Sequence, residues 1–362
     1  MHAATGAPCT EPENTNPTRD LMQLSVHRTI SEINPLEEEW NDLLSCCSAS
    51  HVPFLRHEYL TTWWQTLGGG EWSKGELFVV TAREEDGQLV GVAPLFFTDN
   101  REGESAMLLL GSIEISDYLD LIAPRSALTT FTHLLLELLA SPIAPAWKVL
   151  DLFNLPEHSP TLPNIRAAAE EFAWQYEQQP LQRTPYIPLP GDWETYLASI
   201  DKKQRHEIRR KMRRAEEYPE PVHWYIVTEE ATLHQETEDF LSLMAQDPEK
   251  ERFLTSSMRA QMHATIQAAF REGWLQLAML TVGDQKVAGY LNFDYNGHIW
   301  VYNSGLNFSY HELSPGWVLL GHLLKWANEN QRAAFDFMRG DEEYKYRFGA
   351  IDRYVMRAII RR

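Results

Sequence analysis

The chain has 362 residues, enough for two domains of ordinary size, and 44% of them are hydrophobic and 23% charged. Its formal net charge of −19 disfavours a general nucleic-acid binder, which needs a cationic surface. No apolar run reaches the roughly 18 to 20 residues that cross a bilayer. The three cysteines, an odd number, fit a reducing compartment, and no Cys/His spacing resembles a zinc site. We therefore expect a cytoplasmic protein with no metal and no transmembrane segment.

Three regions are expected along the chain. Residues 1–22 are rich in Pro, Thr, Asn and Glu and predict a disordered leader. Prolines then punctuate the middle of the sequence, and we place a domain boundary at Gly191. The resulting domains are residues 23–190 and 191–362.

The first domain carries two helical patterns, then strands, then strands and helices in alternation. Its expected helices are residues 36–47, 56–67, 127–139 and 165–172, and its expected strands are 78–81, 90–97, 107–110, 118–122 and 149–153. The second domain is expected to have helices at 193–217, 233–245, 258–270 and 315–330, and strands at 275–282, 287–295, 299–304 and 333–338. The turn and strand at 86–96 resemble those at 283–293, which suggests two copies of one α/β unit.

A candidate ligand site lies where the strand 299–304 ends. That end carries Tyr302, Asn303, Ser304 and Gly305, and the loop after it reaches the segment 314–316, Ser-Pro-Gly, before a strongly apolar helix. Ser and Pro favour a helix start, and the free N–H groups there bind phosphate. The alternative is a well-capped helix with no ligand.

Ionisable side chains follow the next strand, 333–338, where ligands of α/β proteins usually bind. Asp341 or Glu342 could act as general base, and Tyr344 as general acid or substrate anchor. Arg339 and Lys345 are the expected substrate-binding residues. The alternative is a surface helix held by ion pairs.

The segment from Tyr302 to Lys345, with its Ser-Pro-Gly at 314–316 and its Arg-Gly-Asp-Glu-Glu-Tyr-Lys at 339–345, resembles the GNAT (Gcn5-related N-acetyltransferase) domain of the CelD-type family. That family is linked to cellulose and exopolysaccharide synthesis. It is similar to the Fem-type aminoacyltransferases, which carry two GNAT units in tandem. The basic run between Lys202 and Arg214 matches the helix that opens the family's second unit.

The resemblance implies an α/β (α+β) fold of two tandem GNAT-like units, each a mixed, mainly antiparallel sheet flanked by helices. Residues 191–362 are then expected to be the acyltransferase domain, and residues 23–190 to be structural or to form one wall of the acceptor cleft. It also implies that Ser314 and Gly316 hold the pyrophosphate of acetyl-CoA or another acyl-CoA, and that Tyr302, Asn303, Ser304 and Gly305 complete the cofactor site. One departure is that most GNAT enzymes have a Gln/Arg-x-x-Gly-x-Gly/Ala loop where this chain has residues 310–316.

The expected reaction is attack of an amine, or less readily a hydroxyl, of a small molecule or saccharide on the thioester. Backbone N–H groups near Asn303 and Gly305 would hold the acyl carbonyl. One alternative is a Fem-type transferase that uses aminoacyl-tRNA, which the net charge disfavours. Another is a non-catalytic partner in polysaccharide synthesis. The sequence leaves the acyl group, the acceptor and the oligomeric state open.

Overall fold

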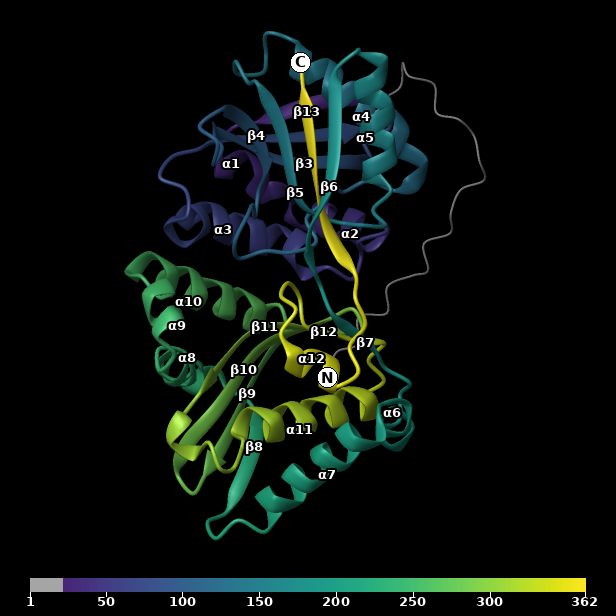
Figure 1. The fold of residues 1–362 in the computed structure, drawn as a ribbon. Helices are drawn as coiled ribbons and strands as arrows, with labels where there is room; N and C mark the ends of the chain where they lie inside the picture. Colours follow the sequence, from purple (N-terminus) through teal and green to yellow (C-terminus); the bar gives the residue numbers. More distant parts are fainter. Residues whose placement is uncertain (1–21) are drawn as a thin grey trace.

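The computed structural model describes residues 22–362, whose strands form two sheets flanked by helices (Figure 1). The predicted leader, residues 1–22, lies outside the described residues except for Met22. The strand orders are β1-β2-β3-β4-β5-β13-β6 and β7-β12-β11-β10-β9-β8. Every neighbouring pair is antiparallel except β4 with β5 and β11 with β12. The predicted fold class, mixed and mainly antiparallel sheets flanked by helices, is confirmed.

The first unit consists of the seven-stranded sheet and its helices. Its strands are β1 (Gln23–His27), β2 (Glu76–Arg83), β3 (Leu89–Asp99), β4 (Ser105–Leu109), β5 (Val149–Pro156), β6 (Gln175–Arg183) and β13 (Tyr354–Arg361). Its helices are α1 (Ile30–Ile33), α2 (Glu37–Ser45), α3 (His57–Gly70), α4 (Arg125–Ala140) and α5 (Thr161–Glu171). The strand predicted at 118–122 is reduced to one isolated bridge between Ile122 and Val92, because Tyr118 has a left-handed backbone (φ 56°).

Both faces of the first sheet are covered. A side chain at position 91 of β3 would meet Phe131 of α4, whereas Phe96 of the same strand packs against Trp63 of α3. Since side chains alternate along a strand, positions 91 and 96 point to opposite faces. Helix α4 therefore covers one face and α3 the other.

The second unit consists of the six-stranded sheet and its helices. Its strands are β7 (Tyr186–Pro188), β8 (Val222–Ile226), β9 (Leu275–Val282), β10 (Gln285–Tyr295), β11 (His298–Leu306) and β12 (Ala334–Asp336). Its helices are α6 (Trp193–Ser199), α7 (Lys202–Glu216), α8 (Glu230–Met244), α9 (Pro248–Phe253), α10 (Ser256–Arg271), α11 (Pro315–Glu329) and α12 (Glu343–Arg347). The single helix predicted at 193–217 is two helices, because the Asp201 carboxylate accepts the N–H groups of Lys203 and Gln204 and so begins α7.

The two units exchange strands across the boundary predicted at Gly191. Strand β7 precedes that boundary but pairs with β12 in the second sheet. Strand β13 ends the chain but lies between β5 and β6 in the first sheet. In Figure 1 the yellow β13 rises out of the lower unit into the upper one, while the teal segment after β6 descends. Two chain crossings therefore join the units.

The units also share a hydrophobic core. The cluster of buried side chains that fills the first unit continues onto one face of the second sheet through Leu277, Leu291, Phe293 and Trp300. The opposite face of that sheet packs against α7 and α11 in a cluster of its own. Because one core spans both units, they form a continuous body and the space between them has fixed walls.

One cysteine, Cys47, is a buried free thiol whose Sγ lies 3.1 Å from the Leu43 carbonyl oxygen, and burial raises its pKa to about 12.

Candidate functional site

The parallel strands β11 and β12 are paired only at their start. His298, Ile299 and Trp300 pair with Ala334, Phe335 and Asp336, in that order. Beyond Trp300, β11 continues to Leu306 with β10 as its only strand partner, and β12 ends at Asp336. The strands therefore part at their carboxyl ends, which is where α/β proteins usually bind ligands.

A β-bulge marks the point at which the two strands part. Leu291 of β10 pairs with Asn303, and the next residue, Asn292, pairs with Val301. Tyr302 is therefore the extra residue of the bulge. Bulges re-aim side chains and are frequent next to active sites.

A cavity of about 290 Å³ lies at this opening. It is lined by parts of both units: the first-unit residues Glu114, Ile115, Asp117 and Gln182, and the second-unit residues Phe253, Met262, Val301, Tyr302, Asn303, Phe337, Met338 and Arg339. Of the site residues predicted from sequence, Tyr302, Asn303 and Arg339 meet there. The volume is at the lower end of the range for small-molecule sites.

Tyr302 and Asn303 contribute polar atoms that the protein itself leaves unused. The Tyr302 hydroxyl is buried without a well-formed hydrogen bond within residues 22–362, although the Tyr59 hydroxyl is nearby. Burial raises the pKa of Tyr302, so its hydroxyl stays protonated at neutral pH. The Asn303 Oδ1 accepts the Ser304 N–H at 2.9 Å, and the Nδ2 has no partner in the described chain.

Ser304 and Gly305 lie further along β11 under the helices of the second unit. Lys250 of α9 donates from its Nζ to the Ser304 carbonyl oxygen at 2.5 Å. Burial lowers the pKa of Lys250, and Asp247 and Glu342 oppose that shift. A Cβ at Gly305 would lie 2.5 Å from the Met244 backbone N, so only glycine allows α8 to pass this close to β11.

The start of α11 differs from the expected serine cap. Ser314 has a left-handed backbone (φ 55°) and its side chain makes no capping hydrogen bond; instead its carbonyl accepts the N–H groups of Trp317 and Val318. Pro315 has no N–H. The next N–H of the helix, that of Gly316, has no partner in the described part of the chain. Lys211 of α7 lies over the Trp317 ring, its Nζ 4.0 Å from the centroid, and brings a cation to this first turn.

The residues after β12 occupy different environments. The Lys345 ammonium is buried and donates to the carbonyl oxygens of Phe337, Arg339 and Gly340 at 3.3, 3.1 and 2.8 Å. Its Nζ also pairs with Glu342 at 2.8 Å. All its donors are thus committed to shaping this loop. Asp341 is exposed.

Tyr344 lies apart from the cavity lining. Its ring contacts that of Phe337 edge to face, with centroids 5.9 Å apart, and it belongs to the cluster packed against α11. Burial raises the pKa of Tyr344, and the neighbouring Tyr290 and Glu342 raise it further. Tyr302 and Tyr344 thus approach the parted strands within different packing clusters.

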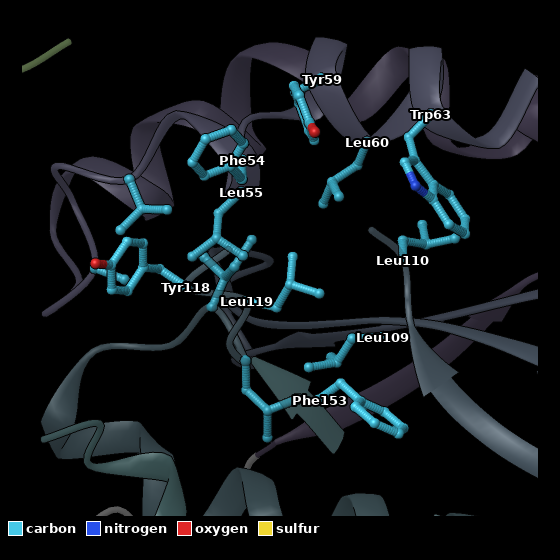
Figure 2. Close-up of a cluster of buried hydrophobic side chains, with 14 of the residues drawn as sticks. Phe54, Leu55, Tyr59, Leu60, Trp63, Leu109, Leu110, Tyr118, Leu119 and Phe153 are labelled. Atoms are coloured by element: carbon cyan, nitrogen blue, oxygen red, sulfur yellow. The ribbon is translucent and has the colours of Figure 1, made fainter. Parts of the chain in front are cut away.

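The first unit contributes to the cavity through the segment 111–118 after β4, whose residues sequence reasoning did not single out. Asn154 Nδ2 donates to the carbonyls of Ile113 and Ser116 at 2.8 Å each, and Trp72 Nε1 donates to the Ser112 carbonyl at 2.6 Å. Figure 2 shows Leu110, just before this segment, and Tyr118, its last residue, in one buried cluster with Tyr59, Leu60 and Trp63 of α3. The segment is therefore fixed and presents Glu114 and Asp117 to the cavity.

One ion pair and one hydrogen bond join this segment to the second unit. Asp117, 3% exposed, pairs with the Arg339 guanidinium and accepts the Arg339 backbone N–H at 3.1 Å. Asp336, fully buried, pairs with Arg353 and accepts from the Tyr118 hydroxyl. Burial raises the pKa of Asp336 to about 6, and Arg353 limits that rise. No sequence signal near Asp117 or Tyr118 points to partners more than 200 residues away.

One family of known proteins matches much of the second unit. Residues 202–346 match the family described as the acetyltransferase (GNAT) domain. The matched segment runs from the start of α7 to α12, so it contains β11, β12 and all the predicted site residues. No curated protein matches the chain in sequence.

Solved structures share the fold of nearly the whole chain. FemX has a TM-score of 0.64 at 12% identity, covering 93% of this chain and 96% of its own. A conserved protein of unknown function from Bacteroides thetaiotaomicron has a TM-score of 0.58 at 10% identity, covering 94% and 100%. L-PGS from Bacillus licheniformis has a TM-score of 0.51 at 12% identity, covering 83% of this chain and 91% of its own. At these low identities, the TM-scores show a shared fold.

Within residues 22–362, no three His, Cys, Asp or Glu side chains gather as ligands for a metal ion. No helix in the same range is long and apolar enough to cross a membrane.

Proposed function

We propose that the protein transfers an acetyl or other acyl group from acyl-CoA to an amine of a small molecule or saccharide. The observation that carries this proposal is the parting of β11 and β12 beside a bulge and a cavity, within a segment that matches an acetyltransferase domain. The resemblance to the CelD-type family supports a cytoplasmic enzyme of polysaccharide synthesis, with residues 191–362 as its catalytic domain.

The donor would approach from the α11 side. The Gly316 N–H and the positive end of the α11 dipole would bind the pyrophosphate, with Lys211 as the nearest cation and Ser314 as the turn that exposes the N–H. The thioester would lie along the open edge of β11, where backbone N–H groups near Asn303 and Gly305 hold the acyl oxygen. Ser304 shapes that edge through Lys250.

The acceptor amine would enter from the cavity and attack the thioester carbonyl. Glu342 or Asp341 would accept the proton of the attacking amine, and the buried Tyr344 hydroxyl would protonate the leaving thiolate. Arg339 lines the cavity and would hold the acceptor, whereas Lys345 would position the loop that carries these groups.

Thermal unfolding with acetyl-CoA, longer acyl-CoAs and free coenzyme A tests the donor. A ligand at about a hundred times its Kd stabilises the native state by about 2.7 kcal/mol. Gly316→Val should abolish this shift, because a Cβ there already lies 2.9 Å from Leu306 Cδ2. Gly321→Val, the same change further along α11, is the control and should keep the shift. No shift with any acyl-CoA would contradict the proposal.

A second candidate is a Fem-type transferase that uses aminoacyl-tRNA. It is supported by the exposed side chains of Lys202, Lys203, Arg213 and Arg214 on α7, which have no acidic partner in the described chain, and by the fold shared with FemX. This candidate predicts tRNA binding that weakens steeply with salt. Salt-dependent tRNA binding without an acyl-CoA shift would replace the first proposal by the second.

A further inference from the structure

We propose that the acceptor carries a carboxylate besides its amine and that Arg339 binds this carboxylate. The inference rests on the proposed acyl transfer and assigns the cavity between the units to the acceptor. The argument uses the hydrogen-bonding capacity that the lining residues have left once their contacts within the protein are counted.

The acidic groups of the lining are each paired with an arginine. The Asp117 carboxylate pairs with Arg339 through Oδ1 and accepts its backbone N–H through Oδ2. The Glu114 carboxylate pairs with Arg101 outside the lining, and the Glu114 carbonyl oxygen accepts from Arg339 Nη2 at 2.5 Å. Each acid of the lining is thus paired with an arginine, and Arg101 is shared between Glu114 and Glu71.

The groups that remain uncommitted are mostly donors. Within residues 22–362, Arg339 Nη1, Asn303 Nδ2 and the Gln182 side-chain amide form no hydrogen bond, and the buried Tyr302 hydroxyl has only a poorly formed contact with the Tyr59 hydroxyl. An arginine nitrogen and an amide nitrogen can only donate, whereas a hydroxyl or a glutamine amide can donate or accept. A ligand group rich in acceptor atoms therefore satisfies this lining, and an ammonium group does not.

Arg339 is held in place for this role. Its Nε faces Asp117 and its Nη2 faces Glu114, both in the fixed segment 111–118, so the guanidinium has one orientation and its side chain is only 16% exposed. A guanidinium fixed in this way binds a planar carboxylate at low entropic cost. A cavity of about 290 Å³ suits a small amino acid or amino-sugar acid better than a macromolecule.

The experiment compares amines that differ only in the carboxylate. Glycine is paired with methylamine, and β-alanine with ethylamine. O-phosphoethanolamine, an amine that carries a phosphate in place of the carboxylate, tests whether the cavity prefers a phosphate. Binding to the full chain is measured by ligand-observed NMR, and acyl transfer is measured by release of free thiol from acetyl-CoA. We expect the carboxylated member of at least one pair to bind and react about 10- to 100-fold better than its partner.

Two variants test the assignment to Arg339 and its neighbour. Arg339→Lys keeps a cation beside Asp117 but removes the free Nη1 donor, and should erase the preference for the carboxylate. Arg353→Lys is the matched control, because Arg353 also pairs with a buried aspartate but does not line the cavity. Asn303→Asp, which turns a donor into a negative charge, should lower affinity for the carboxylated amine if Arg339→Lys fails to fold.

The outcomes separate the two proposals. Equal transfer to both members of every pair would overturn the carboxylate assignment and leave acyl transfer standing. Preference for O-phosphoethanolamine over both carboxylated amines would overturn the carboxylate assignment and show that Arg339 binds a phosphate group of the acceptor. Arg339-dependent binding of a carboxylated amine without any transfer would support the assignment and contradict the acyl-CoA reaction. Absence of binding for all carboxylated amines would overturn the assignment.

Discussion

The hydroxyl of Tyr118, in the first unit, lies 3.0 Å from each carboxylate oxygen of Asp336, in the second. Asp336 is the last residue of β12 that pairs with β11, so this contact lies at the point where the two strands part. Arg353, in the segment that leads into β13, pairs with the same carboxylate. Three distant parts of the chain therefore hold together the point where β11 and β12 part.

Removal of the Tyr118 hydroxyl should weaken the joint between the units. Tyr118→Phe leaves a buried carboxylate with one donor fewer, and hydrogen bonds to charged groups contribute about 1.5–3 kcal/mol. We expect the free energy of unfolding in urea to fall by about that amount. Tyr176→Phe is the control, since that hydroxyl bonds Gln178 at an exposed site, and should change stability by less than about 0.5 kcal/mol. Equal effects of both substitutions would contradict the assignment.

Asp120 should make stability depend on pH between about 4 and 6. It is 2% exposed, accepts from the Ser159 hydroxyl at 2.6 Å, and burial raises its pKa to about 6 from 3.8. The native state therefore holds this proton more tightly than the unfolded state, and the contribution to stability falls as pH rises through the window.

The difference in unfolding free energy between wild type and Asp120→Asn isolates this effect. The unfolding free energy of wild type minus that of the variant should fall by up to about 3 kcal/mol from pH 4 to 6. Above pH 7 this difference should stay constant. Asp336, whose pKa is also raised to about 6, is present in both proteins and cancels. A difference that is flat across the window, or that rises with pH, would show that Asp120 titrates normally.

Gly305→Ala should destabilise the second unit. The new Cβ would lie 2.5 Å from the Met244 N and 2.7 Å from the Leu243 carbonyl carbon, which are backbone atoms that cannot rotate away. We expect a loss of about 1–3 kcal/mol in chemical unfolding. Gly316→Ala meets only the flexible end of Leu306 and should cost clearly less. The prediction fails if the two alanine variants are equally stable.

Tyr344 and Tyr302 should affect different kinetic constants. Tyr344→Phe removes the proposed acid for the leaving thiolate and should lower kcat by about 10²- to 10⁴-fold with little change in the KM of the acceptor. Tyr302→Phe removes a cavity donor and should mainly raise that KM. Initial rates over both substrates distinguish the two effects. A normal kcat for Tyr344→Phe would remove its catalytic role.

Local patterns predicted most helices and the hairpin strands, because capping residues, turns and apolar periodicity act within a few residues. Strands whose partners are distant were missed. Strand β6 is polar and largely exposed, and β13 acquires its position only from β5 and β6.

The same distinction applies to the site. Tyr302, Asn303 and Arg339 meet at the cavity because they lie just beyond the paired part of two neighbouring parallel strands, which sequence can suggest. The ionisable character of Lys345 suggested substrate contact, but the backbone carbonyls that surround its ammonium come from a loop conformation that includes a left-handed Met338 (φ 57°). Asp117 reaches the cavity only through the packing of one unit on the other.

The position of β13 has a consequence for biosynthesis. Domains of a nascent chain usually fold in order as they leave the ribosome. Here β5 and β6 are separated by a strand whose residues, 354–361, are translated about 170 residues after β6. The first unit cannot complete its sheet until nearly all of the second has been synthesised, so we expect the two halves to reach the native state together rather than one after the other.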